Sequence, residues 1–254
     1  MPAPPRILPG ALAAALLIPA AAGAAELSNL DTGLPNTLDD AFAAAPGRFE
    51  LHGAARYDRW VGRDAVRLLP RVQLGIVEGL QANLSLPYSV GSGRRSDPGN
   101  AGAGLLYNPN RETGWLPALA VALDYSTLIG PECRGAEVGL TAIATKTLDP
   151  AVDRRVHLNV AWLRNFDPSE EERRDRTRIA VGYSQLVASD VVVVANYVRE
   201  SQERRERAAN VVEAGLRYQA SEAVTLGAGV GFGIGRDSPR VRALFSVQIG
   251  LGGR

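Results

Sequence analysis

The sequence feature that most constrains this chain is a period-two alternation of apolar and polar residues. Over residues 49–57 every second position is apolar or small, and the positions between them include Glu50, His52 and Arg56. Successive side chains of a β-strand point to opposite faces, so this pattern predicts a strand with one apolar and one polar face. The chain is therefore expected to fold mainly into β-strands.

The same alternation recurs in twelve segments. They cover residues 49–57, 66–76, 80–90, 101–108, 117–128, 136–147, 155–165, 177–187, 191–199, 209–219, 224–234 and 240–251. In a soluble sandwich or lipocalin-like barrel the apolar face would form the core, whereas in an outer-membrane barrel it would meet lipid and the polar face would line the lumen.

Three features favour the membrane barrel over a soluble secreted β domain. The polar face carries many charges, for example Arg67 and Arg71 on one strand. All seven tyrosines fall in predicted strands, as an aromatic girdle at the membrane interfaces requires. Tight turns alternate along the chain with longer, charged connections. We predict an all-β fold, an antiparallel up-and-down transmembrane β-barrel of about 12 strands, with both termini in the periplasm.

The first residues predict export from the cytoplasm. Arg6, the apolar stretch 7–21 and Ala22-Gly23-Ala24 have the order of a cleaved secretory signal peptide. We therefore expect a signal peptide over 1–25, an N-terminal segment over 26–47 and an outer-membrane barrel over 48–254. The predicted localisation is the bacterial cell outer membrane.

The segment 26–47 has two possible places. Thr37 is suited to cap a short helix over 38–45, ended by Pro46-Gly47. One interpretation folds this helix into the lumen as a plug, with Phe42 against the glycine-rich strand 224–234. The other leaves the segment as a periplasmic tail.

Composition excludes several functions. The sequence has 28 basic and 27 acidic side chains and lacks the basic stripe of an electrostatic nucleic-acid binder, so we expect no nucleic-acid partner. The two histidines, His52 and His157, lie on strands about half a barrel apart, and no serine can be placed beside them. We expect no enzyme activity, no catalytic residues, no cofactor and no metal site.

Charged residues of the polar face are the candidate functional residues. The candidates for lining the lumen or pore are Arg56, Arg67, Arg71, Asp124, Glu137, His157, Arg178, Glu213, Arg217 and Arg242. Opposite charges on neighbouring strands would pair and fill the interior. Alternatively, the arginines would form a ladder along a pore that favours anions or carboxylated solutes.

Three sequence blocks resemble a known family. The strings 77–88 (VEGLQANLSLPY), 116–123 (LPALAVAL) and 157–162 (HLNVAW) are similar to blocks of the outer-membrane transporter family called MetA-pathway of phenol degradation. The sequence departs from the family pattern at Gly99-Asn100-Ala101-Gly102 and at Leu128-Ile129-Gly130. The resemblance implies a channel or transporter for small molecules, aromatic compounds among them.

The expected partners are accordingly outer-membrane lipid and a small-molecule solute, and the sequence does not define an oligomeric state. The alternative function is a structural or adhesive outer-membrane barrel with a filled lumen and no transport.

Overall fold

The computed structural model describes residues 25, 27–91, 100–128, 135–202 and 206–251. All but the last residue of the expected signal peptide lies outside this part of the chain. Among the described residues, no helix is long and apolar enough to cross a membrane.

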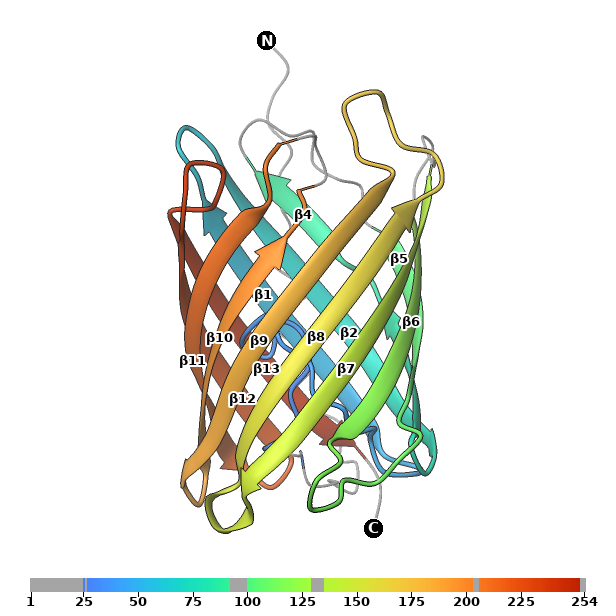
Figure 1. Ribbon diagram of the computed structural model, residues 1–254, viewed down its shortest axis with the longest axis vertical. Helices are drawn as coiled ribbons and strands as arrows, with labels where there is room; N and C mark the ends of the chain where they lie inside the picture. The colour runs from blue at the N-terminus through green and yellow to red at the C-terminus, as the bar shows by residue number, and fades with distance from the viewer. Residues whose placement is uncertain (1–24, 26, 92–99, 129–134, 203–205, 252–254) are drawn as a thin grey trace, which may run out of the picture.

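The described chain is a barrel of tilted antiparallel strands (Figure 1). The strands are β1 (Phe49–Arg59), β2 (Asp64–Val77), β3 (Leu80–Ser85), β4 (Tyr88–Gly91), β5 (Asn100–Tyr107), β6 (Ala118–Leu128), β7 (Ala136–Asp149), β8 (Arg154–Asn165), β9 (Asp175–Ala188), β10 (Val191–Glu200), β11 (Ala209–Ser221), β12 (Val224–Gly233) and β13 (Val241–Leu251). A 3₁₀-helix, η2 (Pro150–Val152), joins β7 to β8. Because β1 pairs with both β2 and β13, the sheet closes on itself.

The wall has twelve strands, as predicted, because β3 and β4 are two parts of one. Both pair with β2, β3 at Arg71–Val77 and β4 at Ala65–Leu68. Pro87 lies between them and has no N–H to donate to a ladder, which interrupts the strand at that point. The backbone is still used there, since the carbonyl of Pro87 accepts from the N–H of Asn100 at 2.9 Å.

The apolar face of the barrel points outward. Leu84 and Phe245 are 63% and 62% exposed on the outer surface, and tyrosines such as Tyr107 and Tyr125 are also exposed there. The polar face points into the lumen, where Glu50, Glu213 and Arg217 are buried. This arrangement agrees with an outer-membrane barrel, in which lipid covers the apolar wall.

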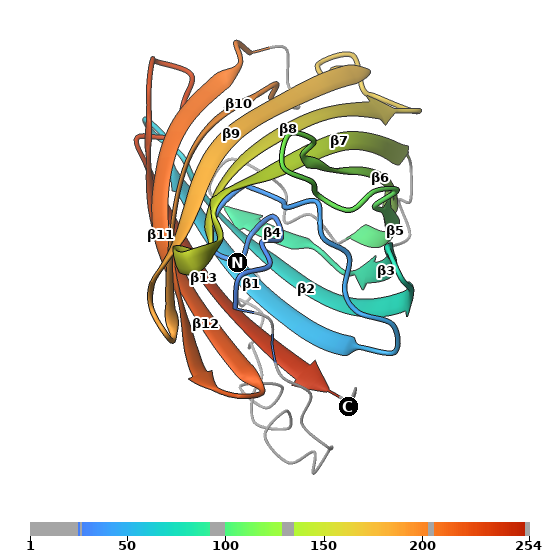
Figure 2. The ribbon, with the colours of Figure 1, turned by 60° about the horizontal axis from the view of Figure 1, so that its bottom comes forward.

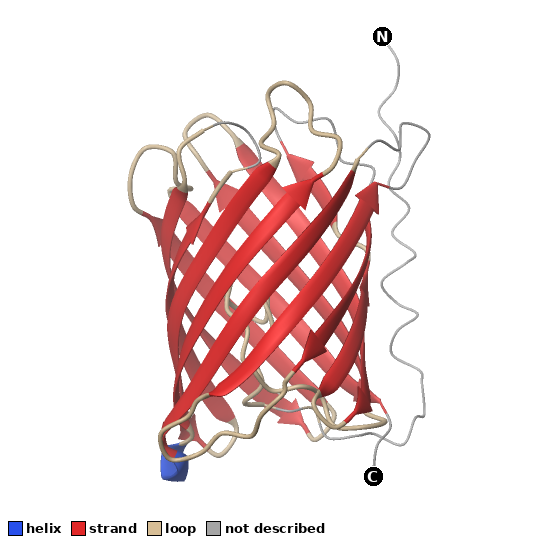
Figure 3. Cartoon of the chain, turned by 45° about the vertical axis from the view of Figure 1, so that its right-hand side comes forward, coloured by secondary structure: helices blue, strands red, loops and turns tan. Residues whose placement is uncertain are grey.

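The N-terminal segment, residues 27–47, runs inside the barrel as an irregular coil (Figures 2 and 3). We call the end of the barrel that carries the short turns 78–79, 189–190 and 222–223 the periplasmic end. The N–H of Ala25 donates to the carbonyl of Glu222, and the N–H of Gly47 donates to that of Gly75. The segment therefore enters and leaves the lumen at the periplasmic end.

The helix predicted over 38–45 is wrong. Three backbone N–H groups of this stretch donate to wall side chains: Asp39 donates to Asn159, Ala41 to Thr145 and Ala44 to Gln81, at 2.8 to 3.0 Å. A helix needs the same N–H groups for its own carbonyls. The wall thus replaces the internal bonds of a helix.

The outward apolar face predicts a position-dependent tolerance of charge. Leu123, half exposed near the middle of β6, should lose about 2 to 4 kcal/mol of folding stability when changed to Arg, because the guanidinium would lie in hydrocarbon. Ser126→Arg is the matched control on the same strand, since Ser126 lines a lumen cavity. Unfolding by denaturant in lipid vesicles measures both. Equal losses would contradict the assignment of the two faces.

Candidate functional site: the lumen and its N-terminal segment

The uncharged part of the N-terminal segment is held by buried wall residues. Arg217, 1% exposed, donates to the backbone carbonyls of Leu27 and Leu34 at 2.8 and 2.9 Å. Glu213, fully buried, accepts from the backbone N–H and the hydroxyl of Thr37 at 2.7 and 3.0 Å. These bonds fix one face of the segment to β11.

A glycine-rich part of the wall makes room for this contact. A Cβ added at Gly215 or Gly229 would lie 2.5 or 2.8 Å from the Oδ1 of Asn36. At Gly215 and Gly227 it would also meet Pro35, at 2.8 and 3.2 Å. Glycine inside a strand allows such a close approach. Residues 35–36 therefore pack against this glycine-rich part of the wall.

The predicted contact of Phe42 with the glycine wall is wrong. Phe42 packs instead against the cluster that contains Ala118 and Ala120 of β6, and the guanidinium of Arg155 lies 4.9 Å from the centre of its ring. Small side chains on β6 leave space for this part of the segment. The segment thus fills the lumen between the glycine-rich strands β11 and β12 and the alanine-rich strand β6.

Together, the segment and the wall close the lumen near the periplasmic end. Every wall strand contributes a lumen side chain there that is at most 6% exposed. This closure ring consists of Glu50, Gln73, Gln81, Leu106, Ala120, Thr145, His157, Ser184, Val192, Arg217, Thr225 and Gln248. Water has almost no contact with any strand at this level, so no open pore passes through the described residues here.

The charged part of the segment faces arginines of the wall. Residues 27–47 contain three aspartates and no basic residue. Asp31 lies 3.4 Å from Arg71 of β2, Asp39 lies 4.0 Å from Arg178 of β9, and Asp40 lies 3.9 Å from Arg155 of β8. Each aspartate therefore faces an arginine on a different strand. Asp31 also lies 3.7 Å from His52, and Arg155 pairs more closely with Asp153, at 2.6 Å.

Asp40 differs from the other two aspartates because it is fully buried. Burial raises the pKa of its carboxyl to about 7, while hydrogen bonds from the N–H groups of Leu30 and Phe42 and the charge of Arg155 oppose the rise. Asp40 is thus only partly ionised at neutral pH. Asp31 and Asp39 are less buried, with 17% of each side chain exposed.

A second group of charges lies further up the lumen, where acidic and basic side chains of the wall pair with one another; its member Glu213 also binds Thr37 of the segment. Arg242, with no exposed side chain, contacts Asp58, Glu200 and Glu213 at 2.6 to 2.8 Å. Arg56 adds contacts to Asp58 and Glu200. These charges pair between strands of one side of the wall, from β1 to β10 in the order β1-β13-β12-β11-β10, and act as internal packing.

The structure places all ten candidate residues on the inner face, in several groups. Arg56, Glu213 and Arg242 lie in the paired charge group, and Arg217 binds carbonyls of the segment. Arg71, Asp124 and Arg178 surround Asp31 and Asp39, and Asp124 is close enough to all four of these charged groups to feel them electrostatically. His157 is in the closure ring. Arg67 and Glu137 line a wide cavity at the opposite end.

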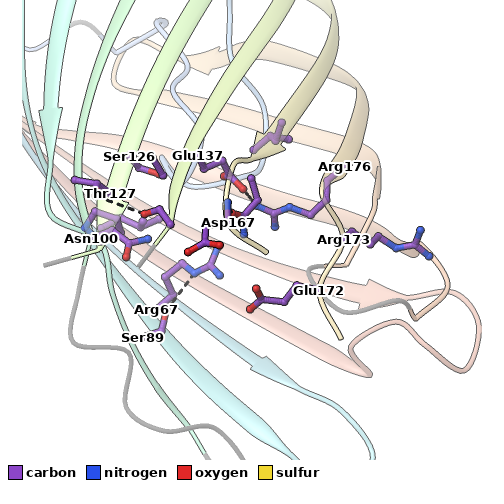
Figure 4. Close-up of a pocket in the computed structure, with 16 residues that line it drawn as sticks. Arg67, Ser89, Asn100, Ser126, Thr127, Glu137, Asp167, Glu172, Arg173 and Arg176 are labelled. Atoms are coloured by element: carbon purple, nitrogen blue, oxygen red, sulfur yellow. Dashed lines mark hydrogen bonds and ion pairs between the residues drawn. The ribbon is translucent and has the colours of Figure 1, made fainter. Parts of the chain in front are cut away.

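This cavity, the vestibule, has a volume of about 340 Å³ and is lined by polar and charged residues (Figure 4). Arg67, Asp167 and Glu172 surround the same opening in Figure 4, and Glu137 pairs with Arg176. A smaller cavity of about 70 Å³ shares Ser126, Glu137 and Leu163 with the vestibule and extends to Asp124 and Arg178. The two cavities adjoin, and this polar path reaches Arg178, the partner of Asp39.

The sequence analysis placed no serine beside His157, yet Ser184 is there. Its Oγ lies 2.9 Å from Nε2 of His157, and Nδ1 lies 3.1 Å from the hydroxyl of Thr145. Ser184 has the polar parity of strand 177–187, so alternation could have placed it in the lumen. Ser184 and His157 are both 2% exposed beneath the segment, so no substrate can reach Oγ in this arrangement. The described residues hold no group of three His, Cys, Asp or Glu side chains fit for a metal ion.

The comparisons with known proteins rest on structure alone. No protein-family model matches the sequence, and no curated protein matches it. A solved structure titled the COG4313 outer membrane channel from Pseudomonas putida F1 is similar, with a TM-score of 0.60 and 12% identity over 84% of this chain and 98% of that one. The KdgM porin in complex with disordered oligogalacturonate has a TM-score of 0.53 and 8% identity over 79% and 98% of the two chains.

An autotransporter translocator domain, that of NalP from Neisseria meningitidis, has a TM-score of 0.52 and 12% identity over 83% of this chain and 90% of that one. At such identities the likeness shows the fold. The chain has the closed antiparallel fold of outer-membrane barrels, and the solved structures it resembles are named as a channel, a porin and a translocator.

The paired charge group predicts a large cost for losing its central cation. Arg242→Met would leave Asp58 and Glu200 with Arg56 as their remaining cationic partner and would remove the ion pair of Glu213, so folding stability should fall by about 3 to 5 kcal/mol. Arg63→Met is the control, because Arg63 pairs with Glu206 near the surface and should cost about 1 kcal/mol or less. Denaturant unfolding in vesicles compares them, and equal costs would count against the buried network.

The raised pKa of Asp40 predicts that acid tightens the segment. A released Asp40 has its ordinary pKa near 3.8, so docking binds a proton between about pH 4 and 7. Docking is therefore favoured below pH 7 and weakens as pH rises through 7. In a Cys133→Ser background, a cysteine at buried position 44 should react with maleimide on the order of tenfold or more slowly at pH 5 than at pH 8.

Rates for this assay are divided by those of Glu78→Cys, an exposed control in a periplasmic turn, to remove the pH dependence of the thiol itself. Asp40→Asn should abolish most of the difference between the two pH values. If the pH dependence of labelling persists in Asp40→Asn, a group other than Asp40 causes it.

Proposed function

We propose that this protein is an outer-membrane channel for small polar solutes and that the N-terminal segment is its gate. The closure ring carries this proposal: the segment blocks the lumen on every strand at one level, while a polar vestibule leads to it from the other end. A barrel whose interior is filled only for stability would not need polar cavities that lead toward the segment. The likeness to a named channel and a named porin supports the same interpretation.

The polar lining of the two cavities indicates which class of solute the channel would carry. Among the described residues, those that line the vestibule and the smaller cavity include Arg67, Arg176 and Arg178 together with acidic and hydroxyl side chains, and none of them is aromatic. Such a lining favours hydrophilic, charged solutes over aromatic hydrocarbons. Transport of aromatic compounds, and membership of the MetA-pathway of phenol degradation family, rest on the three sequence blocks and remain predictions.

A structural barrel without transport is the second candidate. The buried bonds of Arg217 and Glu213 to the segment favour it, because breaking them without replacement costs free energy. On this view the segment belongs permanently to the core. The two candidates differ in whether the segment leaves the lumen.

Conductance in a planar bilayer separates them. Deleting residues 27–45 behind an intact signal sequence should raise the single-channel conductance severalfold, because nothing then fills the closure ring. A deletion variant that assembles normally and conducts like the parent would favour the structural barrel.

A point substitution tests the same gate without shortening the chain. Gly229→Val should loosen the segment and raise the fraction of time in conducting states, because its Cβ would meet Asn36 at 2.8 Å. Gly139→Val is the matched control: it faces the smaller cavity, meets no atom closer than 3.7 Å, and should leave conductance equal or lower. The same effect from both variants would contradict the proposed gate.

A further inference from the structure

Two ion pairs between the segment and the wall come from opposite sides of the barrel. Arg71 lies on β2 and Arg178 on β9, and the strand order places five wall strands between β2 and β9 in either direction when β3 and β4 count as one. The arginines thus approach Asp31 and Asp39 from facing walls. The two carboxylates lie between them.

These pairs are looser than the contacts that anchor the uncharged part of the segment. Their distances are 3.4 and 4.0 Å, and the four side chains are 17% to 24% exposed. The bonds of Arg217 and Glu213 to the segment are as short as 2.7 to 2.9 Å and fully buried. Water and dissolved ions therefore reach the acidic face and not the anchored face.

The Asp39–Arg178 pair lies where a solute from the vestibule would meet the segment. Arg178 lines the smaller cavity that continues from the vestibule. Asp124 lines it too, so three acidic side chains lie near the two arginines while both aspartates are in place. A solute that added negative charge would be repelled, whereas one that replaced the two carboxylates would leave the charge unchanged.

Asp31 and Asp39 are mechanically linked. Asp39 accepts hydrogen bonds from the backbone N–H and the hydroxyl of Thr32 at 2.6 and 2.7 Å. Thr32 follows Asp31 in the chain, so the two carboxylates move together. Displacing one therefore displaces the other.

From these contacts we propose that Arg71 and Arg178 form a binding site for a small dicarboxylate, and that Asp31 and Asp39 occupy this site as tethered competitors. The solute replaces the two aspartate carboxylates on the two arginines and shifts the segment toward release. This inference rests on the proposed gate and names the ligand that opens it. The equilibrium moves only by the difference in affinity of the solute for the released and docked states.

The test is maleimide labelling of a cysteine at position 44, in the full-length Cys133→Ser protein at pH 8. Succinate, glutarate and adipate are the probes, and the neutral diamide of each is its control. We expect at least one dicarboxylate to accelerate labelling about tenfold, a typical coupling between two sites, and the diamides to have no effect. Labelling of Glu78→Cys should not respond to any of them.

The arginines are tested by the double variant Arg71→Gln/Arg178→Gln. Its basal labelling should be faster, because the segment has lost two ion pairs, and dicarboxylates should no longer change it. Arg56→Gln is the control, since Arg56 pairs with Asp58 and Glu200 away from the segment, and it should keep the acceleration. Acceleration that persists in the double variant, or none with any dicarboxylate in the parent, overturns the site.

These outcomes are distinct from failure of the gate. If deletion of 27–45 opens the channel and dicarboxylates leave labelling unchanged, the gate stands and this ligand class is wrong. If dicarboxylates accelerate labelling and the deletion conducts like the parent, the site stands and the channel function is wrong.

Discussion

Hydrocarbon leaves no partner for an unpaired backbone group, and the whole structure follows from that constraint. A sheet that crosses a membrane must close, so β1 pairs with both β2 and β13. Closure by twelve strands encloses a lumen, and the lumen must hold water, side chains or another part of the chain. Here the 27–47 segment fills the periplasmic part, and side chains and polar cavities occupy the rest.

The alternation of apolar and polar residues predicts much of this fold. The period of two predicts the strands and their faces, because lipid on one side and polar groups on the other repeat at every second residue. Parity also places all ten candidate residues on the inner face, and bare strands such as 224–234 indicate space for an insert. The interruption of the strand at Pro87 also follows from the sequence, because proline has no N–H to donate to a β-ladder.

The conformation of the segment could not be predicted from the sequence, because its hydrogen-bond partners lie far away along the chain. Thr37 looks like a helix cap, but its N–H and hydroxyl bind Glu213, 176 residues later. The partners of each arginine depend in the same way on where the segment lies, so the sequence could not separate paired charges from those facing Asp31 and Asp39. His157 and Ser184 meet only because β8 and β9 pair in one particular register.

The segment enters and leaves at one end, while the vestibule opens at the other, and this gives the molecule a direction. The cavity at the vestibule end is lined by Arg178, whereas the other end holds the closure ring and the buried face of the coil. In the channel proposed above, the two mouths of the barrel are therefore not equivalent. A solute added at the vestibule end should act on the segment at a lower concentration than the same solute added at the other end.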